Sequence, residues 1–246
     1  MIELPKGIVK ASVQNPKNLI IFGLPKIGKT TALSTLPNSL LVDLENGSDY
    51  ISGVKVKVNS IKEINELRKA IKEAGNPYEF IIVDTVTALE EMAKPLALKM
   101  LLESPAGTNF TGNDPTQAPN GLGWGLMRQA LQKLIDIFAQ CAKNVILVGH
   151  VKDKNIVDTD GNITANIKEL DLAGKTGRIL AAKSDAIAFC HRDKDGNLCL
   201  NFATSDDISV GARPEHLRGQ DIVIAEKQSD GTFTSHWERV FPSLNK

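Results

Sequence analysis

A phosphate-binding loop is the clearest chemical signature in the sequence. The segment GLPKIGKT, Gly23 to Thr30, fits the pattern GxxxxGK[ST] in full, and a short apolar run precedes it. Its glycines let backbone N–H groups surround phosphate oxygens, and the following helix start adds the positive end of its dipole. Lys29 would reach the β- and γ-phosphates, and Thr30 would bind Mg²⁺. The expected nucleotide-binding residues are Gly23, Leu24, Pro25, Lys26, Ile27, Gly28, Lys29, Thr30 and Thr31.

A second Gly-Lys-Thr sequence, at residues 174–176, does not fit this pattern. Glu169 occupies the position of the leading glycine, and no apolar strand runs into the segment. We therefore expect no second phosphate loop there.

Acidic residues follow two of the apolar runs. Asp84 ends the run FIIVD, which is typical of a carboxylate that holds a metal ion and its water shell. Asp43 and Glu45 lie two residues apart, so in an extended chain they would point the same way. Glu45 is the candidate catalytic base, and the alternative is a solvated acidic turn. Thr85 could help to fix the metal shell or could lie in a solvated turn.

His150 follows the apolar run NVILVG and would reach the same edge of the sheet. A histidine there could sense the γ-phosphate by hydrogen bonding, and the alternative is a structural histidine at a strand end. The other histidines and the cysteines show no metal-ligand spacing and no CxxC pair, so we expect neither a zinc site nor a disulfide framework. These residues are His191, His216, His236, Cys141, Cys190 and Cys199.

Short apolar runs alternate with helix-like segments along the chain. The pattern Ser60-Ile-Lys-Glu63 is a capping box that starts one helix, Gly75 ends it, and a second apolar stripe covers residues 124–141. Continuous apolar runs indicate buried strands, and their alternation with helices predicts an α/β fold with a mainly parallel sheet flanked by helices. The expected strands are residues 19–22, 40–42, 80–83, 145–148 and 186–189.

Two longer stretches interrupt this alternation. Residues 103–123 are rich in Gly, Pro, Asn and Thr, and a loop of this length is usually functional or disordered. Residues 152–172 contain a hairpin-turn signal, Asp158-Thr-Asp-Gly161, and a second such signal is Asp193-Lys-Asp-Gly196. We therefore expect β-hairpin additions to the sheet.

Length and composition limit the protein class. The 246 residues suit one large α/β domain. No apolar run approaches the roughly 20 residues that span a bilayer. The first twelve residues lack the apolar core of a signal peptide. We therefore expect a cytoplasmic protein with no membrane partner. The formal net charge is +0, from 29 basic and 29 acidic residues, so any nucleic-acid binding must come from a local patch.

The order of these motifs resembles the RecA-like recombinase core: GxxxxGKT, then a strand with DxE, a strand ending in Asp, and a strand ending in a polar sensor. More narrowly, VDLENG, ILVGHVKDK and AGKTGRILAAKSDAIAF resemble small phage-encoded RecA-like ATPases linked to single-strand annealing and recombination. The resemblance covers residues 16–193 of a single domain, 1–246, with 194–246 as a C-terminal extension. It implies that Glu45 is the base and His150 the sensor, a position where the family often has Gln.

The resemblance also implies partners. It implies an ATP-hydrolysing, Mg²⁺-dependent protein that assembles as a ring or filament, in the host cytoplasm if phage-encoded, with the active site between subunits. It further implies single-stranded DNA as a ligand, contacted by the two long stretches, and a single-strand-binding protein as a further partner. The candidates for a basic residue acting on the neighbouring subunit are Lys175, Arg178 and Arg213. The candidate DNA contacts are Lys152, Lys154, Lys168, Lys175 and Arg178, with Phe110 and Trp124 as stacking surfaces, although core packing suits Trp124 better. Acidic neighbours dilute this basic patch, and the alternative is a solvated hairpin; they are Asp153, Asp158, Asp160, Glu169 and Asp171.

Two other functions fit the phosphate loop. One is a nucleotide-gated accessory protein of replication or assembly that hardly hydrolyses ATP. The other is a P-loop kinase for a small acceptor, which usually carries arginine in a lid. Residues 103–123 contain no Arg or Lys, which disfavours the kinase.

Overall fold

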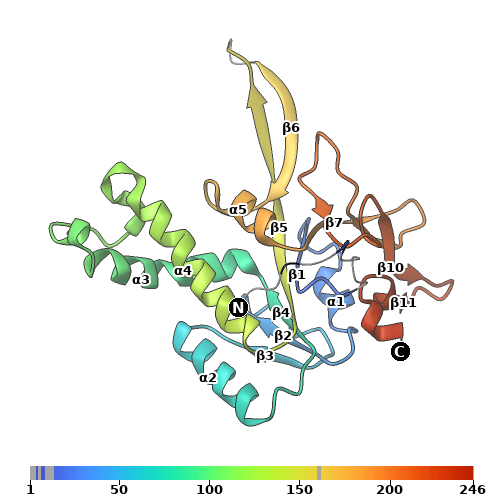
Figure 1. Ribbon diagram of the computed structural model, residues 1–246. Helices are drawn as coiled ribbons and strands as arrows, with labels where there is room; N and C mark the ends of the chain where they lie inside the picture. Colours follow the sequence, from blue (N-terminus) through green and yellow to red (C-terminus); the bar gives the residue numbers. More distant parts are fainter. Residues whose placement is uncertain (1–3, 5–6, 9–13, 160–161, 246) are drawn as a thin grey trace.

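The computed structural model describes residues 4, 7–8, 14–159 and 162–245 (Figure 1). Most of the N-terminal stretch, 1–12, lies outside these residues. So do Asp160 and Gly161 of the first expected hairpin turn. No helix in the described part of the chain is long and apolar enough to cross a membrane.

A central parallel sheet confirms the α/β class expected from the sequence. The pairs β1–β5, β1–β7, β4–β5, β2–β4 and β2–β3 are all parallel, and the strand order across the sheet is β7-β1-β5-β4-β2-β3. All five predicted runs form strands. The strands of this part are β1 (Asn18–Gly23), β2 (Ser39–Asp43), β3 (Lys55–Lys57), β4 (Phe80–Asp84), β5 (Asn144–Val157) and β7 (Ala186–Arg192).

Helices cover both faces of the sheet because its strands alternate apolar side chains between two cores. Ile20 and Phe22 face a core shared with α2, α3, α4 and α5, whereas Leu19 and Ile21 face a core shared with α1 and the C-terminal segment. This two-sided burial explains the continuous apolar runs. The helices are α1 (Lys29–Leu33), α2 (Ile61–Glu73), α3 (Val86–Leu102), α4 (Leu122–Ala139) and α5 (Thr176–Lys183).

The predicted cap of α2 forms with one change. The Ser60 hydroxyl accepts a hydrogen bond from the Glu63 N–H, as expected for a capping box, but the Glu63 carboxylate accepts from the N–H of Asn59 instead of that of Ser60. Gly75, with φ of 78°, follows the helix end as expected.

The stretch 103–123 is a series of short turns packed against α3 and α4. The turns are η1 (Pro105–Gly107), η2 (Pro115–Gln117) and η3 (Pro119–Gly121). A Cβ atom on Gly123 would lie 1.6 Å from the carbonyl oxygen of Pro115, so only glycine allows this approach. Trp124, beside it, is 39% exposed, so the core packing expected for this residue is wrong.

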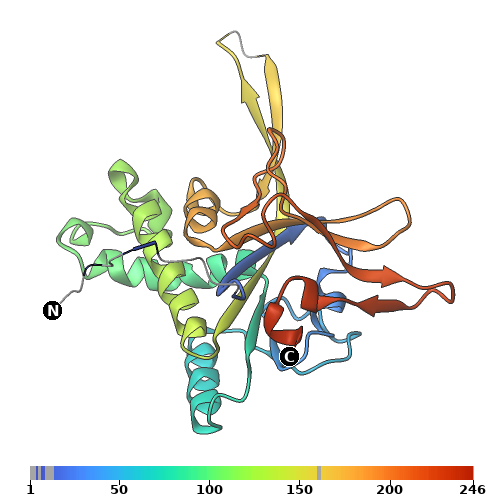
Figure 2. The ribbon, with the colours of Figure 1, turned by 45° about the vertical axis from the view of Figure 1, so that its right-hand side comes forward.

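Both predicted hairpins are present. Strand β5 continues beyond the sheet and pairs antiparallel with β6 (Ile163–Leu170), forming a ribbon that projects from the body of the molecule (Figures 1 and 2). Ile156, Val157 and Ile163 near its tip are exposed. The second hairpin joins β7 to β8 (Leu198–Asn201) through the turn that contains Gly196, whose φ is 84°.

The C-terminal segment extends the sheet with antiparallel strands. β8 pairs with β7 and with β10 (Asp221–Lys227), β10 pairs with β11 (Phe233–Ser235), and β9 (Gly211–Ala212) pairs with β7. Trp237, in the turn η4 (Trp237–Arg239), is buried, and its indole N–H donates to the Ala32 carbonyl (3.0 Å) and the Thr35 hydroxyl (3.2 Å). Through Trp237 the C-terminal segment is hydrogen-bonded to the end of α1, the helix that follows the phosphate-loop sequence. A last turn, η5 (Pro242–Asn245), ends this part.

We expect Trp237→Phe to lower the free energy of unfolding by about 1–3 kcal/mol, because the substitution removes a buried hydrogen bond to the end of α1 and leaves a small void. Urea unfolding measures the change. The matched control is Trp124→Phe, at a half-exposed tryptophan, which should change stability by less than about 0.5 kcal/mol. Equal losses in the two variants would contradict this role of Trp237.

Candidate functional site

The carboxyl ends of four adjacent strands form the candidate site. In the parallel register Gly23 of β1 pairs with His150 of β5, and Asp84 of β4 pairs with Val148 of β5 and with Asp43 of β2. Ligands of open α/β sheets bind at this edge. A cavity of about 400 Å³ opens there, lined by the phosphate loop and by acidic and histidine side chains from β2, β4 and β5.

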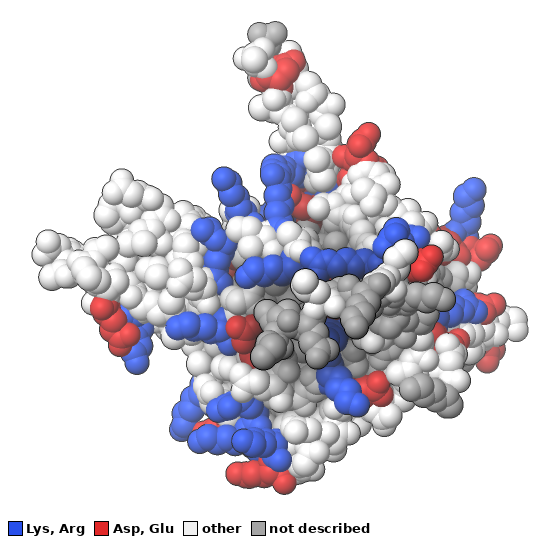
Figure 3. Space-filling model, viewed as in Figure 1, with Lys and Arg blue, Asp and Glu red and all other residues white. Residues whose placement is uncertain are grey.

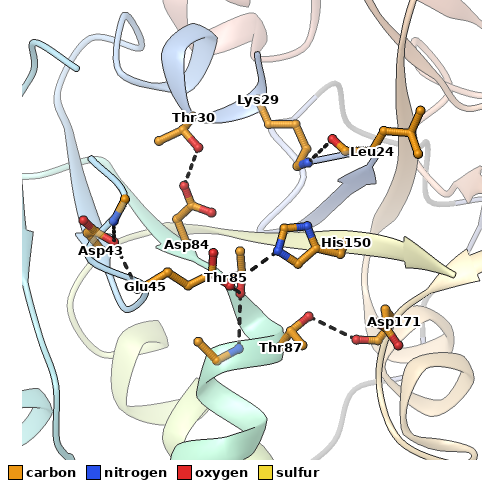
Figure 4. Close-up of polar contacts among 12 residues, drawn as sticks. Leu24, Lys29, Thr30, Asp43, Glu45, Asp84, Thr85, Thr87, His150 and Asp171 are labelled. Carbon is orange, nitrogen blue, oxygen red and sulfur yellow. Dashed lines mark hydrogen bonds and ion pairs between the residues drawn. The ribbon is translucent and has the colours of Figure 1, made fainter. Parts of the chain in front are cut away.

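The phosphate loop holds Lys29 at the carboxyl end of β1. The Lys29 ammonium donates to the carbonyl oxygens of Gly23 (3.1 Å) and Leu24 (2.8 Å), as drawn in Figure 4 for Leu24. Burial lowers the pKa of Lys29, although the nearby Cys190, Asp84 and Glu45 groups act in the opposite direction. An anionic phosphate entering the loop would offset that desolvation and compete with the two carbonyls for the same ammonium hydrogens.

Thr30 and Asp84 meet across the site. The Thr30 hydroxyl donates to the Asp84 carboxylate at 2.6 Å (Figure 4). Burial raises the pKa of Asp84, the Thr30 hydrogen bond lowers it, and the Glu45 charge raises it further. A partly buried carboxylate beside a hydroxyl is the oxygen donor set that Mg²⁺ prefers, so these two residues fit the expected metal site.

Glu45 lies across the cavity from Lys29 and is held by two neighbours. Its carboxylate accepts a 2.6 Å hydrogen bond from the Thr85 hydroxyl and lies 3.4 Å from Nε2 of His150 (Figure 4). The Glu45 side chain is 41% exposed, so one side of it can still meet solvent or a ligand. Thr85 is 2% exposed and also accepts the Ala88 N–H at the start of α3. Thr85 therefore positions Glu45 and is not a solvated turn residue.

His150 sits where β5 leaves the core sheet for the hairpin. Its Nδ1 atom is buried and has no hydrogen-bond partner among the described residues. Its carbonyl oxygen accepts the N–H of Asp171, at the end of β6, at 2.9 Å. His150 is therefore connected to both strands of the hairpin, through β5 itself and through this hydrogen bond.

The extended chain expected from Asp43 to Glu45 is not present, although both residues line the cavity. Strand β2 ends at Asp43, and its buried carboxylate turns back to accept hydrogen bonds from the N–H groups of Glu45 (3.0 Å), Gly47 (3.3 Å) and Ser48 (3.0 Å) and from the Ser48 hydroxyl (2.6 Å). Burial acts to raise the pKa of Asp43, but these hydrogen bonds, the Ser48 hydroxyl first, hold it below its ordinary value. Asp43 thus fixes the loop that carries Glu45.

Arg192 is a neighbour of the phosphate loop that the sequence does not single out. A Cβ atom on Gly28, whose φ is 112°, would lie 3.0 Å from a guanidinium nitrogen of Arg192. The same side chain donates to the Gly196 carbonyl (2.7 Å) and lies over the Phe233 ring, 5.1 Å from its centre. Only the pairing of β7 with β1 brings Arg192 here, and no local motif marks it.

The second Gly-Lys-Thr sequence has a different setting. It follows β6 of the hairpin instead of a core strand, and α5 begins at its threonine, Thr176. Gly174 has a φ of 55°, which makes it the turn between the two elements.

Comparison with known proteins gives one family. The sequence model of the family described as AAA domain matches residues 15–232. No curated protein matches the sequence. A similar solved structure is the KaiC-like protein PH0186 from the hyperthermophilic archaeon Pyrococcus horikoshii OT3, with 9% sequence identity and a TM-score of 0.45 over 89% of this chain and 90% of that chain.

We expect Asp43→Asn to lower the free energy of unfolding at pH 7 by about 1–3 kcal/mol, because an amide cannot accept all four hydrogen bonds. The pKa of Asp43 is lowered by folding, so its contribution is present above about pH 4 and is lost as the pH falls through the folded-state value. Urea unfolding at pH 7 and pH 3 should therefore show a smaller difference between variant and wild type at pH 3.

The control for this comparison is Asp49→Asn, at an exposed carboxylate paired with Lys57, where the effect should stay below about 1 kcal/mol. A difference between Asp43→Asn and wild type that is the same at both pH values would contradict the assignment.

Proposed function

The chain belongs to the AAA domain family, and from this premise we propose that it binds ATP with Mg²⁺ and hydrolyses it at the carboxyl ends of β1, β2, β4 and β5. The observation that carries the proposal is the pair of contacts on either side of one cavity, Thr30 with Asp84 and Thr85 with Glu45. The Thr30–Asp84 pair suits a metal ion beside bound phosphates. The Thr85–Glu45 pair leaves the Glu45 carboxylate facing the same cavity.

Each residue has a distinct task in this proposal. The phosphate loop and Lys29 would bind the phosphates, and Thr30 and Asp84 would hold Mg²⁺, which would neutralise phosphate charge. Glu45, kept in place by Thr85, accepts a proton from the attacking water. His150, 3.4 Å from Glu45, is placed to orient that water or to contact the γ-phosphate.

We further propose that a second copy of the chain completes the site with a basic residue. Two of the three candidates are already engaged within their own chain. Arg178 lies 3.5 Å from Glu169, and Arg213 lies 3.6 Å from Asp185 and donates to the Ala182 carbonyl. Lys175 is exposed at the start of α5, and the described residues give its side chain no ion pair, which favours it for this role.

Single-stranded DNA is the ligand that we propose for the face around the hairpin base. Figure 3 shows Lys and Arg side chains gathered below the hairpin, with acidic side chains beside its base and near its tip. Lys154 and Lys168 belong to the hairpin, and Lys175 is the residue just before α5. Lys152 is a weaker candidate than expected, because its ammonium is bound by the Leu172 carbonyl and lies close to Glu169.

Strand β5 supports a coupling between the two ligands. It carries His150 in the core and continues into the hairpin, so the nucleotide state could change DNA affinity through one continuous strand. By linkage, DNA would then tighten ATP binding to the same degree. Recombination or annealing of single strands is the task that this combination suits.

We expect Lys29→Ala to lose ATP binding, whereas Glu45→Gln should bind ATP and hydrolyse it at least ~100-fold more slowly, as for the loss of a positioned base. Equilibrium binding of a fluorescent ATP analogue and steady-state phosphate release measure the two properties. The control is Glu73→Gln, on the last turn of α2, which should match wild type in both.

Wild-type turnover in Glu45→Gln would remove Glu45 from the mechanism. If wild-type protein binds ATP but releases no phosphate with or without DNA, a nucleotide-gated accessory protein replaces the proposed ATPase.

We expect single-stranded DNA to stimulate ATP hydrolysis, with stimulation that fades as salt rises, because phosphate contacts release counterions. The variant Lys154→Ala, Lys168→Ala, Lys175→Ala should bind DNA more weakly and lower the slope of log affinity against log salt by about 2, at roughly 0.7 per contact. Fluorescence anisotropy at several salt concentrations measures the slope.

The charge-matched control replaces Lys62, Lys69 and Lys72 of α2, at the far end of the molecule from the hairpin (Figure 1). If wild type and both triple variants have the same slope, DNA does not bind at the hairpin base. It then binds at another face of the protein or does not bind at all.

A further inference from the structure

Three side chains with different donor atoms converge on the antiparallel part of the sheet. His191 of β7 pairs directly with Cys199 of β8, and Cys199 pairs with Val223 of β10. Asp221 lies two residues from Val223 and therefore on the same face of β10. One ligand atom from each of His191, Cys199 and Asp221 lies within 4.8 Å of the other two.

Cys199 lies on β8, and the side chains of His191 from β7 and Asp221 from β10 meet over this strand. Nε2 of His191 lies 3.0 Å from both carboxylate oxygens of Asp221, although β8 separates their two strands. Cys199, on the strand between them, is 2% exposed. A nitrogen, a sulfur and an oxygen donor thus meet at one half-buried point.

The hydrogen bonding of His191 makes this point attractive to a cation. Its Nδ1 lies 3.3 Å from the carbonyl oxygen of Arg192, which can only accept, so Nδ1 carries the hydrogen. Nε2 therefore faces a carboxylate that is also an acceptor. A metal cation between the two would resolve this contact, because both groups are metal ligands. An Nδ1–H bonded to a carbonyl is the usual support of a metal-binding histidine.

The thiol in this cluster makes a long hydrogen bond. Cys199 Sγ donates to the Asn197 carbonyl at 3.8 Å, and Asp193 is a further neighbour of the thiol. A metal ion bound here would take the Cys199 sulfur as a thiolate, since coordinating thiols are deprotonated.

We propose that His191, Cys199 and Asp221 form a zinc-binding site with a fourth position open to water. Nitrogen, thiolate and carboxylate together are ligands of Zn²⁺, whereas Mg²⁺ and Ca²⁺ take oxygen ligands. The three residues lie far apart in the sequence, which is why no motif marks them. The site would join β7, β8 and β10 next to Arg192, the neighbour of the phosphate loop.

Cobalt titration of the full chain tests this site without reference to ATP hydrolysis. Protein freed of metal by chelation, without nucleotide, should bind one Co²⁺ per chain and show a thiolate-to-cobalt charge-transfer band in the near ultraviolet. Excess Zn²⁺ should remove the band. Thr30 and Asp84 offer no sulfur, so Co²⁺ at the phosphate-loop site cannot produce it.

Variants assign the ligands. Cys199→Ser should abolish the band, and Cys141→Ser, at a buried cysteine of the other core, should keep it. Asp221→Asn, at a half-exposed position that should fold normally, should weaken Zn²⁺ at least ~10-fold. Zinc should also raise the melting temperature of wild type more than that of Asp221→Asn.

Any of three results would overturn the proposal. The first is the absence of a charge-transfer band at stoichiometric Co²⁺ in wild type. The second is a band that persists in Cys199→Ser, and the third is unchanged zinc affinity in Asp221→Asn.

Discussion

The parallel hydrogen-bonded register of β1, β5, β4 and β2 is the constraint on which the candidate site depends. Because β1 and β4 end beside residues 148–150 of β5, and β2 ends beside β4, the residues Gly23, His150, Asp84 and Asp43 lie along one edge of the sheet although they are far apart in the sequence. Strand β5 lies between the strand that leads into the phosphate loop and the strand that ends in Asp84. A histidine on β5 is thereby set between the phosphate-binding side and the acidic side.

Burial of charge is the second feature that organises the site. Lys29, Asp84 and Asp43 are all largely removed from solvent, and hydrogen bonds compensate the burial of each charge. Lys29 donates to loop carbonyls, and Asp84 accepts from the Thr30 hydroxyl. Asp43 accepts from four donors of the following turn. Uncompensated burial would cost several kcal/mol for each charge. Glu45 remains partly exposed, and this difference separates the residues that build the site from the residue that faces the cavity.

The sequence predicts the parts of this protein that depend on neighbouring residues. The phosphate loop, the cap at Ser60 and both hairpin turns are local patterns, and the buried strands follow from continuous apolar runs. The direction of Asp43 could not be predicted, because it depends on where β2 ends. Arg192 and the cluster around Cys199 depend on which distant strands pair. Helix α3 has apolar residues on several sides and contains Pro95, so its pattern does not mark it clearly.

The length of β5 has a mechanical consequence. The strand continues for seven residues beyond His150, and at about 3.3 Å per residue it extends roughly 23 Å from the sheet edge. If the ribbon tilted as a rigid body about His150, its outer end would move farther than its base. A tilt of about 5° would displace that end by about 2 Å, given the same rise per residue. A displacement too small to disturb the packed core would then be larger at the exposed residues Ile156, Val157 and Ile163.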